Sequence, residues 1–174
     1  MDKVILYGTT GTGKTTSLEN LNPEECVLIK VVNKPLSFDG KKWTKLSKEN
    51  PNGSVVVSDK PETICKVIKN TERKIIIVDD FQYIMANAFM NGVDRTYSGG
   101  EAFQRFNVIA KDIYDVMHAA LDAEDDKIIY FLAHTEESQS GKIKVKTIGK
   151  LLDEKVVLEG LCTIVLRSIV TNGV

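Results

Sequence analysis

The sequence predicts an α/β fold with a mostly parallel central sheet and helices on both faces. Short apolar runs of strand length alternate with longer segments of helical periodicity, the order expected when helices connect parallel strands. The first apolar run leads into a glycine-rich loop, and the fourth ends in two adjacent carboxylates. A length of 174 residues suits a single domain over residues 1–174.

The individual elements follow from these patterns. Strands are predicted at 4–7, 26–31, 54–57, 74–78, 128–133 and 162–168, and helices at 14–21, 61–70, 81–91 and 101–123. The polar segments 33–53 and 136–150 predict irregular structure. In the last helix, apolar side chains recur at steps of three and four residues. They predict one buried stripe: Phe103, Phe106, Ala110, Ile113, Met117 and Leu121.

Composition excludes several classes of protein. Hydrophobic residues make up 43% and charged residues 27%, and the formal net charge is −1, so any nucleic-acid contact must come from local patches. No apolar run approaches the roughly 18 residues of a membrane span, and no signal-peptide pattern begins the chain. We therefore expect a cytoplasmic protein without a membrane partner. The three cysteines form no C-x-x-C pair and are expected to be buried, reduced thiols.

The loop after the first predicted strand matches G-x-x-x-x-G-K-[ST], the phosphate-binding P-loop. Its glycines allow a tight turn whose N–H groups form a concave nest for phosphate oxygens, and the predicted helix adds its N-terminal donors. Lys14 can reach the β- and γ-phosphates, and the Thr15 hydroxyl can ligate Mg²⁺. The expected nucleotide-binding residues are Gly8, Thr9, Thr10, Gly11, Thr12, Gly13, Lys14, Thr15 and Thr16.

The strand over 74–78 ends in Asp79 and Asp80, which predict the second half of a nucleotide site. In a P-loop fold the first acid lies opposite the Lys14/Thr15 turn and holds Mg²⁺, so Thr15 and Asp79 are the expected metal residues. The second acid, Asp80, can orient or activate the attacking water. Acidic residues around the second strand (Glu24, Glu25 and Asp39) are weaker candidates for that base.

The strand over 128–133 ends in His134 and Thr135. In many ATPases a strand lies between the loop strand and the Asp strand, and its polar last residue senses the γ-phosphate; either residue suits that role. The four arginines do not cluster as in the phosphate clamps of kinases, which disfavours a small nucleotide kinase. A GTPase is disfavoured because Asn33-Lys34-Pro35-Leu36 lacks the Asp of a base-reading Asn-Lys-x-Asp element.

Five segments occur in an order typical of one family: the P-loop, 33–38, 78–83, 133–136, and 146–150 followed by 160–166. The chain resembles the phage-encoded RecA-like P-loop ATPases of the Sak single-strand-annealing group, over residues 3 to about 168. The resemblance implies a RecA-like core, ATP with Mg²⁺, single-stranded DNA as partner and a role in phage recombination, in the cytoplasm of a bacterial host. It also implies a homo-oligomer with ATP between protomers. In that assembly Lys146 and Lys150 are candidates to reach a neighbour's γ-phosphate.

Two segments offer DNA contacts. Trp43 lies among four lysines and could stack on a base, and the loop over 91–100 carries Arg95 and Tyr97 beside glycines. Solvated surface loops are the alternative for both segments. At the level of function, two alternatives to the ATPase stay open: a nucleotide-gated DNA- or protein-binding module with negligible hydrolysis, and a small nucleotide kinase.

Overall fold

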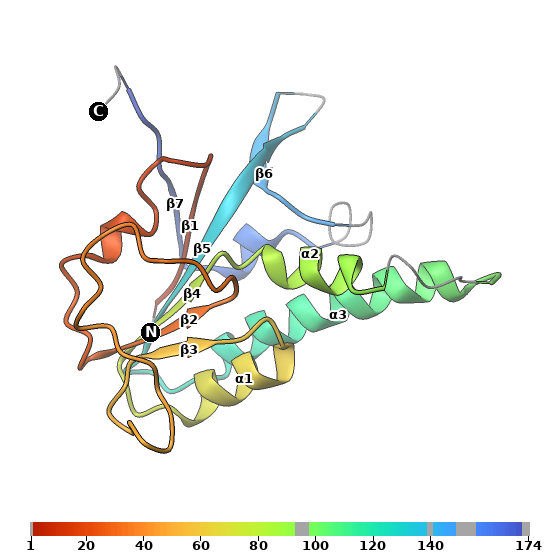
Figure 1. Ribbon diagram of the computed structural model, residues 1–174. Helices are drawn as coiled ribbons and strands as arrows, with labels where there is room; N and C mark the ends of the chain where they lie inside the picture. Colours follow the sequence, from red (N-terminus) through yellow and green to blue (C-terminus); the bar gives the residue numbers. More distant parts are fainter. Residues whose placement is uncertain (1, 93–97, 139–140, 149–155, 172–174) are drawn as a thin grey trace.

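The computed structural model describes residues 2–92, 98–138, 141–148 and 156–171. Within these ranges the strands form one seven-stranded sheet of order β3-β2-β4-β5-β1-β7, with β6 paired to β5 (Figure 1). Neighbours along this order run parallel, and β6 is antiparallel to β5. The predicted α/β fold with a mostly parallel sheet is therefore confirmed. The strands are β1 (Lys3–Gly8), β2 (Cys26–Lys30), β3 (Val55–Val57), β4 (Ile75–Asp79), β5 (Ile128–Glu137), β6 (Ile143–Val145) and β7 (Ile164–Arg167).

The described α-helices are α1 (Pro61–Asn70), α2 (Tyr83–Met90) and α3 (Glu101–Leu121), and two short 3-10 helices are η1 (Thr16–Leu18) and η2 (Leu158–Leu161). Helix α1 shows why these segments are helical. Pro61 occupies its first turn, where a missing N–H costs nothing, and Ile64 and Ile68 bury one face completely. Its chain becomes extended at Thr71 and leads into β4.

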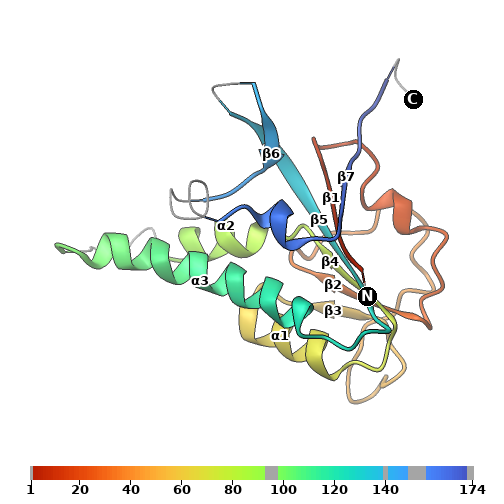
Figure 2. The same ribbon diagram turned by 180° about the vertical axis from the view of Figure 1, so that it is seen from behind.

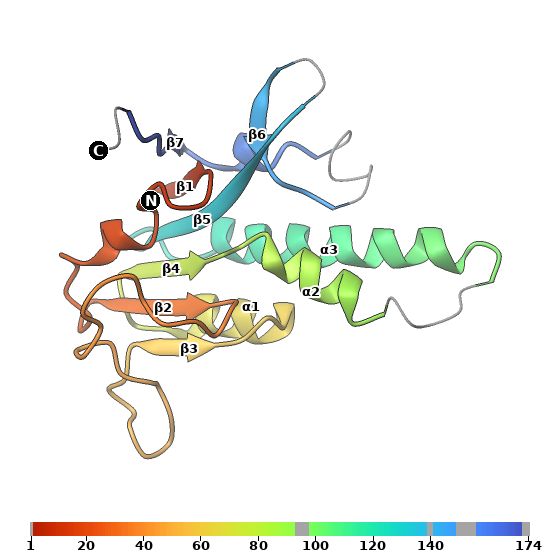
Figure 3. The ribbon, with the colours of Figure 1, turned by 45° about the horizontal axis from the view of Figure 1, so that its top comes forward.

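The prediction that helices cover both faces of the sheet is wrong, because α1, α2 and α3 all cover the same face (Figures 1 and 2). Side chains alternate along β2: Val27 and Ile29 point into the core beneath these helices, and Cys26 and Leu28 point to the other face. That second face is covered by η1 and the long connection between β2 and β3, which contribute Leu18 and Trp43. Figure 3 shows this connection looping beside the sheet edge, away from the helices.

The helix predicted over 14–21 is also wrong. After the glycine-rich loop the chain forms only the three-residue η1, held by turn hydrogen bonds such as Leu18 N–H to Thr15 O at 3.1 Å. The segment has an apolar stripe of only Leu18 and Leu21, and Asn22-Pro23 ends it. At this point the chain therefore offers the N–H groups of the loop itself and no long helix dipole.

The buried stripe predicted for α3 is confirmed only in the helix's second half. Ala110, Ile113 and Met117 are buried, whereas Phe103 is 78% exposed. The first turns of α3 project beyond the sheet, so no sheet residue lies there to cover Phe103 (Figure 3). Phe106 instead stacks on Phe89 of α2, with ring centroids 5.8 Å apart.

Of the two polar segments, 33–53 is irregular as predicted, with a single bridge from Lys45 to Val55. The segment 136–150 instead contains β6, which forms a hairpin with the end of β5. The three cysteines are free, but only Cys26 is fully buried, whereas Cys65 and Cys162 are partly exposed. Burial raises the pKa of the Cys26 and Cys162 thiols to about 11 in each case, so both are protonated at neutral pH.

Trp43 belongs to the core, which contradicts its predicted role as a base-stacking residue in an exposed loop. It is 9% exposed and meets Phe38 edge to face at 6.3 Å, beneath the second face of the sheet. We expect Trp43→Ala to lower the free energy of unfolding by about 3–5 kcal/mol in urea denaturation. Leu46→Ala, at a 37% exposed site in the same loop, should cost under about 1 kcal/mol. A stable Trp43→Ala protein with weakened single-stranded DNA binding would contradict this assignment.

The sheet order brings the predicted site segments together. β5 lies between β1 and β4, as expected for the strand over 128–133. Gly8 pairs in register with His134, and Lys30 with Asp79, so the carboxyl ends of four parallel strands lie at one edge. Polar residues that follow these strands meet there. Among the described residues, no helix combines the length and hydropathy needed to cross a membrane.

Candidate functional site

The loop after β1 has the backbone shape that its glycines predict. Gly11 and Gly13 both have φ of +81°, a region that residues with a Cβ rarely adopt. Gly8 is needed for space, because a Cβ there would lie 2.7 Å from the backbone oxygen of Ser168, which follows β7. The Thr12 hydroxyl closes the loop by donating to Thr9 O at 2.9 Å.

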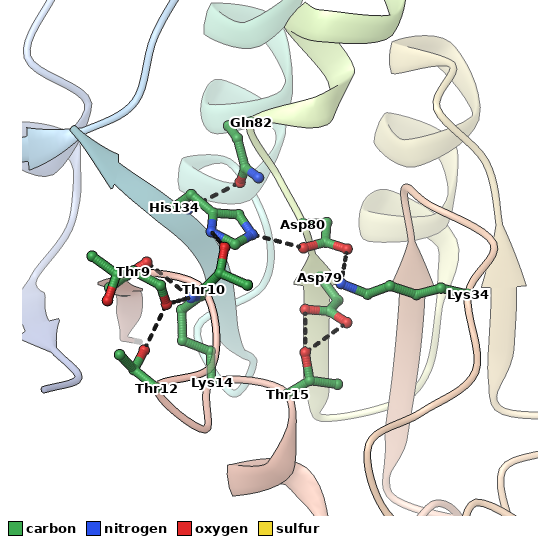
Figure 4. A network of polar contacts seen from close by, with 11 residues as sticks. Thr9, Thr10, Thr12, Lys14, Thr15, Lys34, Asp79, Asp80, Gln82 and His134 are labelled. Atoms are coloured by element: carbon green, nitrogen blue, oxygen red, sulfur yellow. Dashed lines mark hydrogen bonds and ion pairs between the residues drawn. The ribbon is translucent and has the colours of Figure 1, made fainter. Parts of the chain in front are cut away.

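Lys14 folds back over this loop. Its Nζ donates to Gly8 O at 2.9 Å and Thr9 O at 2.8 Å, and the residue is 8% exposed (Figure 4). Burial lowers the pKa of Lys14, and the nearby ammonium of Lys34 lowers it further, against the opposing effect of two carboxylates. The ammonium thus lies inside the loop, held by neutral carbonyls that an anion can replace as partners.

Thr15 and Asp79 are in direct contact. The Thr15 hydroxyl lies 3.1 and 3.2 Å from the two carboxylate oxygens of Asp79 at the end of β4. Asp79 is 3% exposed, and its pKa is raised, first by burial and second by the charge of Asp80. The Thr15 hydroxyl, the backbone of Asp80 and the charge of Lys34 only partly compensate this burial, which favours binding of a cation.

Asp80 has a strained backbone. Its φ is +62°. Among the described residues, Asp80 alone has a positive φ without being a glycine. Asp tolerates this conformation better than most residues, but such strain is typical of functional sites. The strain aims a carboxylate that is 5% exposed toward two partners: Lys34 Nζ at 2.5 Å and His134 Nε2 at 3.4 Å (Figure 4).

Lys34 is a site residue that the sequence analysis did not assign. It follows β2 and reaches Asp80 from the wall opposite His134, with 45% of its side chain exposed. Burial alone would lower its pKa, but the hydrogen bond and charge of Asp80 outweigh burial, so the pKa is raised. The signal was present, because Asn33-Lys34-Pro35 follows a parallel strand and such residues gather at the same sheet edge.

His134 lies between the loop and Asp80. Its pKa is lowered, first by burial and then by the charge of Lys14, so the imidazole is neutral at pH 7. The Nε2 atom of this neutral ring faces the Asp80 carboxylate and therefore carries the proton. The Nδ1 atom is then free to accept from the Thr10 hydroxyl at 3.4 Å. Gln82, a buried residue that the sequence analysis also missed, fixes the backbone by accepting the His134 N–H at 3.1 Å.

These groups surround a cavity of about 310 Å³, lined by the loop from Thr10 to Thr16 together with Lys34, Asp80 and His134. A second cavity of about 340 Å³ adjoins it, and Thr10 and His134 line both. Thr135 and Lys146 line the second cavity only. Lys146 is attached to this site through its backbone N–H, which donates to His134 O at 2.8 Å.

Other predicted candidates lie elsewhere. Glu24 and Glu25 precede β2, so they lie at the sheet edge opposite the loop and cannot serve as its base. Asp39 is 69% exposed and pairs with Lys41 outside the cavity. Lys150, Arg95 and Tyr97 fall outside the described residues.

The donor set fits a magnesium-bound phosphate chain. Among the described residues no group of three or more His, Cys, Asp or Glu side chains could hold a metal by itself. Mg²⁺ commonly takes only one or two protein oxygens and completes its shell with phosphate and water, and Thr15 with Asp79 provides such a pair. Lys14 and the nest of N–H groups match phosphate oxygens.

Comparison of the chain with protein-family models and with curated proteins finds no match. Its function is therefore inferred from the geometry of this site and from the sequence patterns that form it.

Proposed function

We propose that this protein is an Mg-ATP-binding ATPase with a RecA-like P-loop core, acting on single-stranded DNA in phage recombination and annealing. The observation that carries the proposal is the contact of the Thr15 hydroxyl with Asp79, beneath a glycine loop that encloses the Lys14 ammonium. These two residues are 64 positions apart in the sequence, and together they supply the hydroxyl and the carboxylate that a phosphate-bound Mg²⁺ requires. The strand order with β5 between β1 and β4 supports a RecA-like arrangement.

The roles of the residues follow from their places. The N–H groups of residues 9–16 and Lys14 bind the phosphates, and Thr15 with Asp79 holds Mg²⁺. Asp80 orients the attacking water, because its carboxylate lines the cavity in which the terminal phosphate would lie. Neutral His134 touches both Asp80 and the loop residue Thr10, so it is placed to report the state of the phosphate pocket.

DNA binding rests on the family resemblance and on exposed charge. With Trp43 buried, the lysines around it (Lys41, Lys42, Lys45 and Lys48) remain exposed and can contact a phosphate backbone without base stacking. The homo-oligomer is likewise carried by the resemblance. Lys146 lines a cavity beside its own phosphate pocket, which favours action within one protomer over action on a neighbour.

The test is the rate of ATP hydrolysis with and without single-stranded DNA, at several salt concentrations. We expect slow hydrolysis that DNA accelerates, and an acceleration that declines steeply with salt because DNA contacts are mainly to phosphates. A protein that binds ATP but hydrolyses none under any of these conditions would be the nucleotide-gated binding module instead. A protein that does not bind Mg-ATP contradicts the proposal altogether.

A second candidate is a small-molecule kinase, favoured by the second cavity that shares His134 with the phosphate pocket. Two of the arginines argue against it: Arg73 donates to the backbone oxygens of Pro23 and Asn52, and Arg105 packs over Phe89. Neither lines the second cavity. Labelled γ-phosphate that appears on a nucleoside monophosphate rather than in inorganic phosphate would establish the kinase.

A further inference from the structure

We infer that Lys34 is a second phosphate-binding lysine, which binds the terminal phosphate of the nucleotide while it holds Asp80, and so makes the site prefer a triphosphate to a diphosphate. This inference rests on the proposed function and adds a residue to it. The observation behind it is the ion pair of 2.5 Å between Lys34 Nζ and Asp80 Oδ2, on the wall of the phosphate cavity.

The first step concerns reach. Lys34 is 45% exposed and Asp80 is 5% exposed, so the ammonium enters the cavity from the solvent side and the carboxylate forms the inner wall. An ammonium has three N–H donors, and Asp80 Oδ2 uses one of them. Lys34 lines the cavity together with the phosphate-binding loop and His134, so the remaining donors are available to a ligand there. Lys34 can therefore bind a phosphate oxygen without leaving Asp80.

The second step concerns charge. The described cavity region holds two carboxylates, Asp79 and Asp80, and two ammoniums, Lys14 and Lys34, with His134 neutral at pH 7. These four charges balance. A triphosphate with one Mg²⁺ remains an anion, and its outermost phosphate must approach Asp80 if that residue orients the attacking water. A cation between the two is required to offset their repulsion, and Lys34 already contacts the carboxylate.

The third step concerns the loop that carries Lys34. The Thr16 hydroxyl, at the end of the phosphate loop, lies 2.8 Å from the hydroxyl of Ser37. Pro35 restricts the backbone next to Lys34, and both Pro35 and Ser37 line the same cavity. The segment that carries Lys34 is thus attached to the phosphate loop through Ser37, three residues after it. An ordinary surface ion pair forms without a cavity beside it and without attachment to a neighbouring loop, so these two features favour a ligand-binding role for Lys34.

The test compares binding of Mg-ADP with binding of a magnesium complex of a non-hydrolysable ATP analogue, by calorimetry. For Lys34→Met we expect affinity for the analogue to fall about tenfold or more while affinity for ADP stays within about twofold, because only the terminal phosphate loses a charged donor. Lys34→Arg should restore most of the preference. Lys111→Met is the matched control: it removes an exposed ammonium that pairs with a carboxylate at the same distance of 2.5 Å, that of Asp115 in α3, away from the cavity.

Each outcome separates this inference from the proposed function. Wild-type protein that binds neither nucleotide contradicts the proposed function, and the inference falls with it. Wild-type protein that binds both, with an unchanged affinity ratio in Lys34→Met, overturns the inference alone. An equal loss of both affinities also overturns it, because Lys34 would then support the loop rather than the terminal phosphate.

Discussion

Replacing Lys14 with Met is expected to weaken Mg-ATP binding by about tenfold to a hundredfold without unfolding the protein. A hydrogen bond to a charged group contributes roughly 1.5–3 kcal/mol, and Lys14 is the ammonium enclosed by the phosphate loop. Its partners are carbonyl oxygens of the loop, and its pKa is lowered by burial. A neutral side chain of similar length therefore removes an unfavourable buried charge, and the free energy of unfolding should stay the same or rise.

Lys3, in the strand that precedes the phosphate loop, offers a matched control. It is 2% exposed, its Nζ has no hydrogen-bond partner, and burial lowers its pKa too, but it lies at the opposite end of β1. Lys3→Met should likewise preserve or raise stability and should leave nucleotide affinity unchanged. Nucleotide titration and urea denaturation of both variants separate the two effects. Wild-type affinity in Lys14→Met would contradict the assignment of the phosphate loop.

The half of the site that the sequence predicted is the half specified by local geometry. The loop from Gly8 to Thr16 needs glycines at positive φ and follows a strand directly, so its motif is visible without any tertiary information. Asp79 and Asp80 were predictable because an apolar strand that ends in acids places them at a known sheet edge. Their partners were less visible, because Lys34 and Gln82 reach the site from other connections.

The errors over 14–21 and at Trp43 have a common physical origin, which is the way the second face of the sheet is covered. Helical periodicity in 14–21 is weak, and nothing local indicates that an irregular segment will replace a helix as cover. Trp43 among lysines has the composition of a surface loop, but its indole fills the gap between that segment and the sheet while the lysines remain in solvent. Sequence pattern alone does not distinguish an exposed tryptophan that stacks on a base from a tryptophan that packs into the core.

The second large effect concerns the two adjacent acids, which should separate into different functions. Asp79→Asn should abolish Mg-dependent nucleotide binding while raising stability at neutral pH. Burial and the charge of Asp80 raise the pKa of Asp79 in the folded protein above that of an ordinary aspartate, so its ionisation opposes folding. Asn is neutral at every pH and still accepts from Thr15. The gain in stability should therefore be full above the raised pKa of Asp79 and vanish as the pH falls below about 4, the ordinary pKa of an aspartate.

Asp80→Asn should instead preserve Mg-ATP affinity and lower turnover by about 10²–10⁴-fold, the range for losing a general base. Asn tolerates the φ of +62° at this position nearly as well as Asp, so the variant changes charge without adding backbone strain. Loss of the Asp80 charge also frees the ammonium of Lys34, which is half-exposed and can be solvated by water. Nucleotide titration with and without Mg²⁺, together with turnover rates, distinguishes the two variants. If Asp80→Asn lost affinity and Asp79→Asn lost only turnover, the assigned roles would be exchanged, because the metal would then be held by the strained residue rather than by the partner of Thr15.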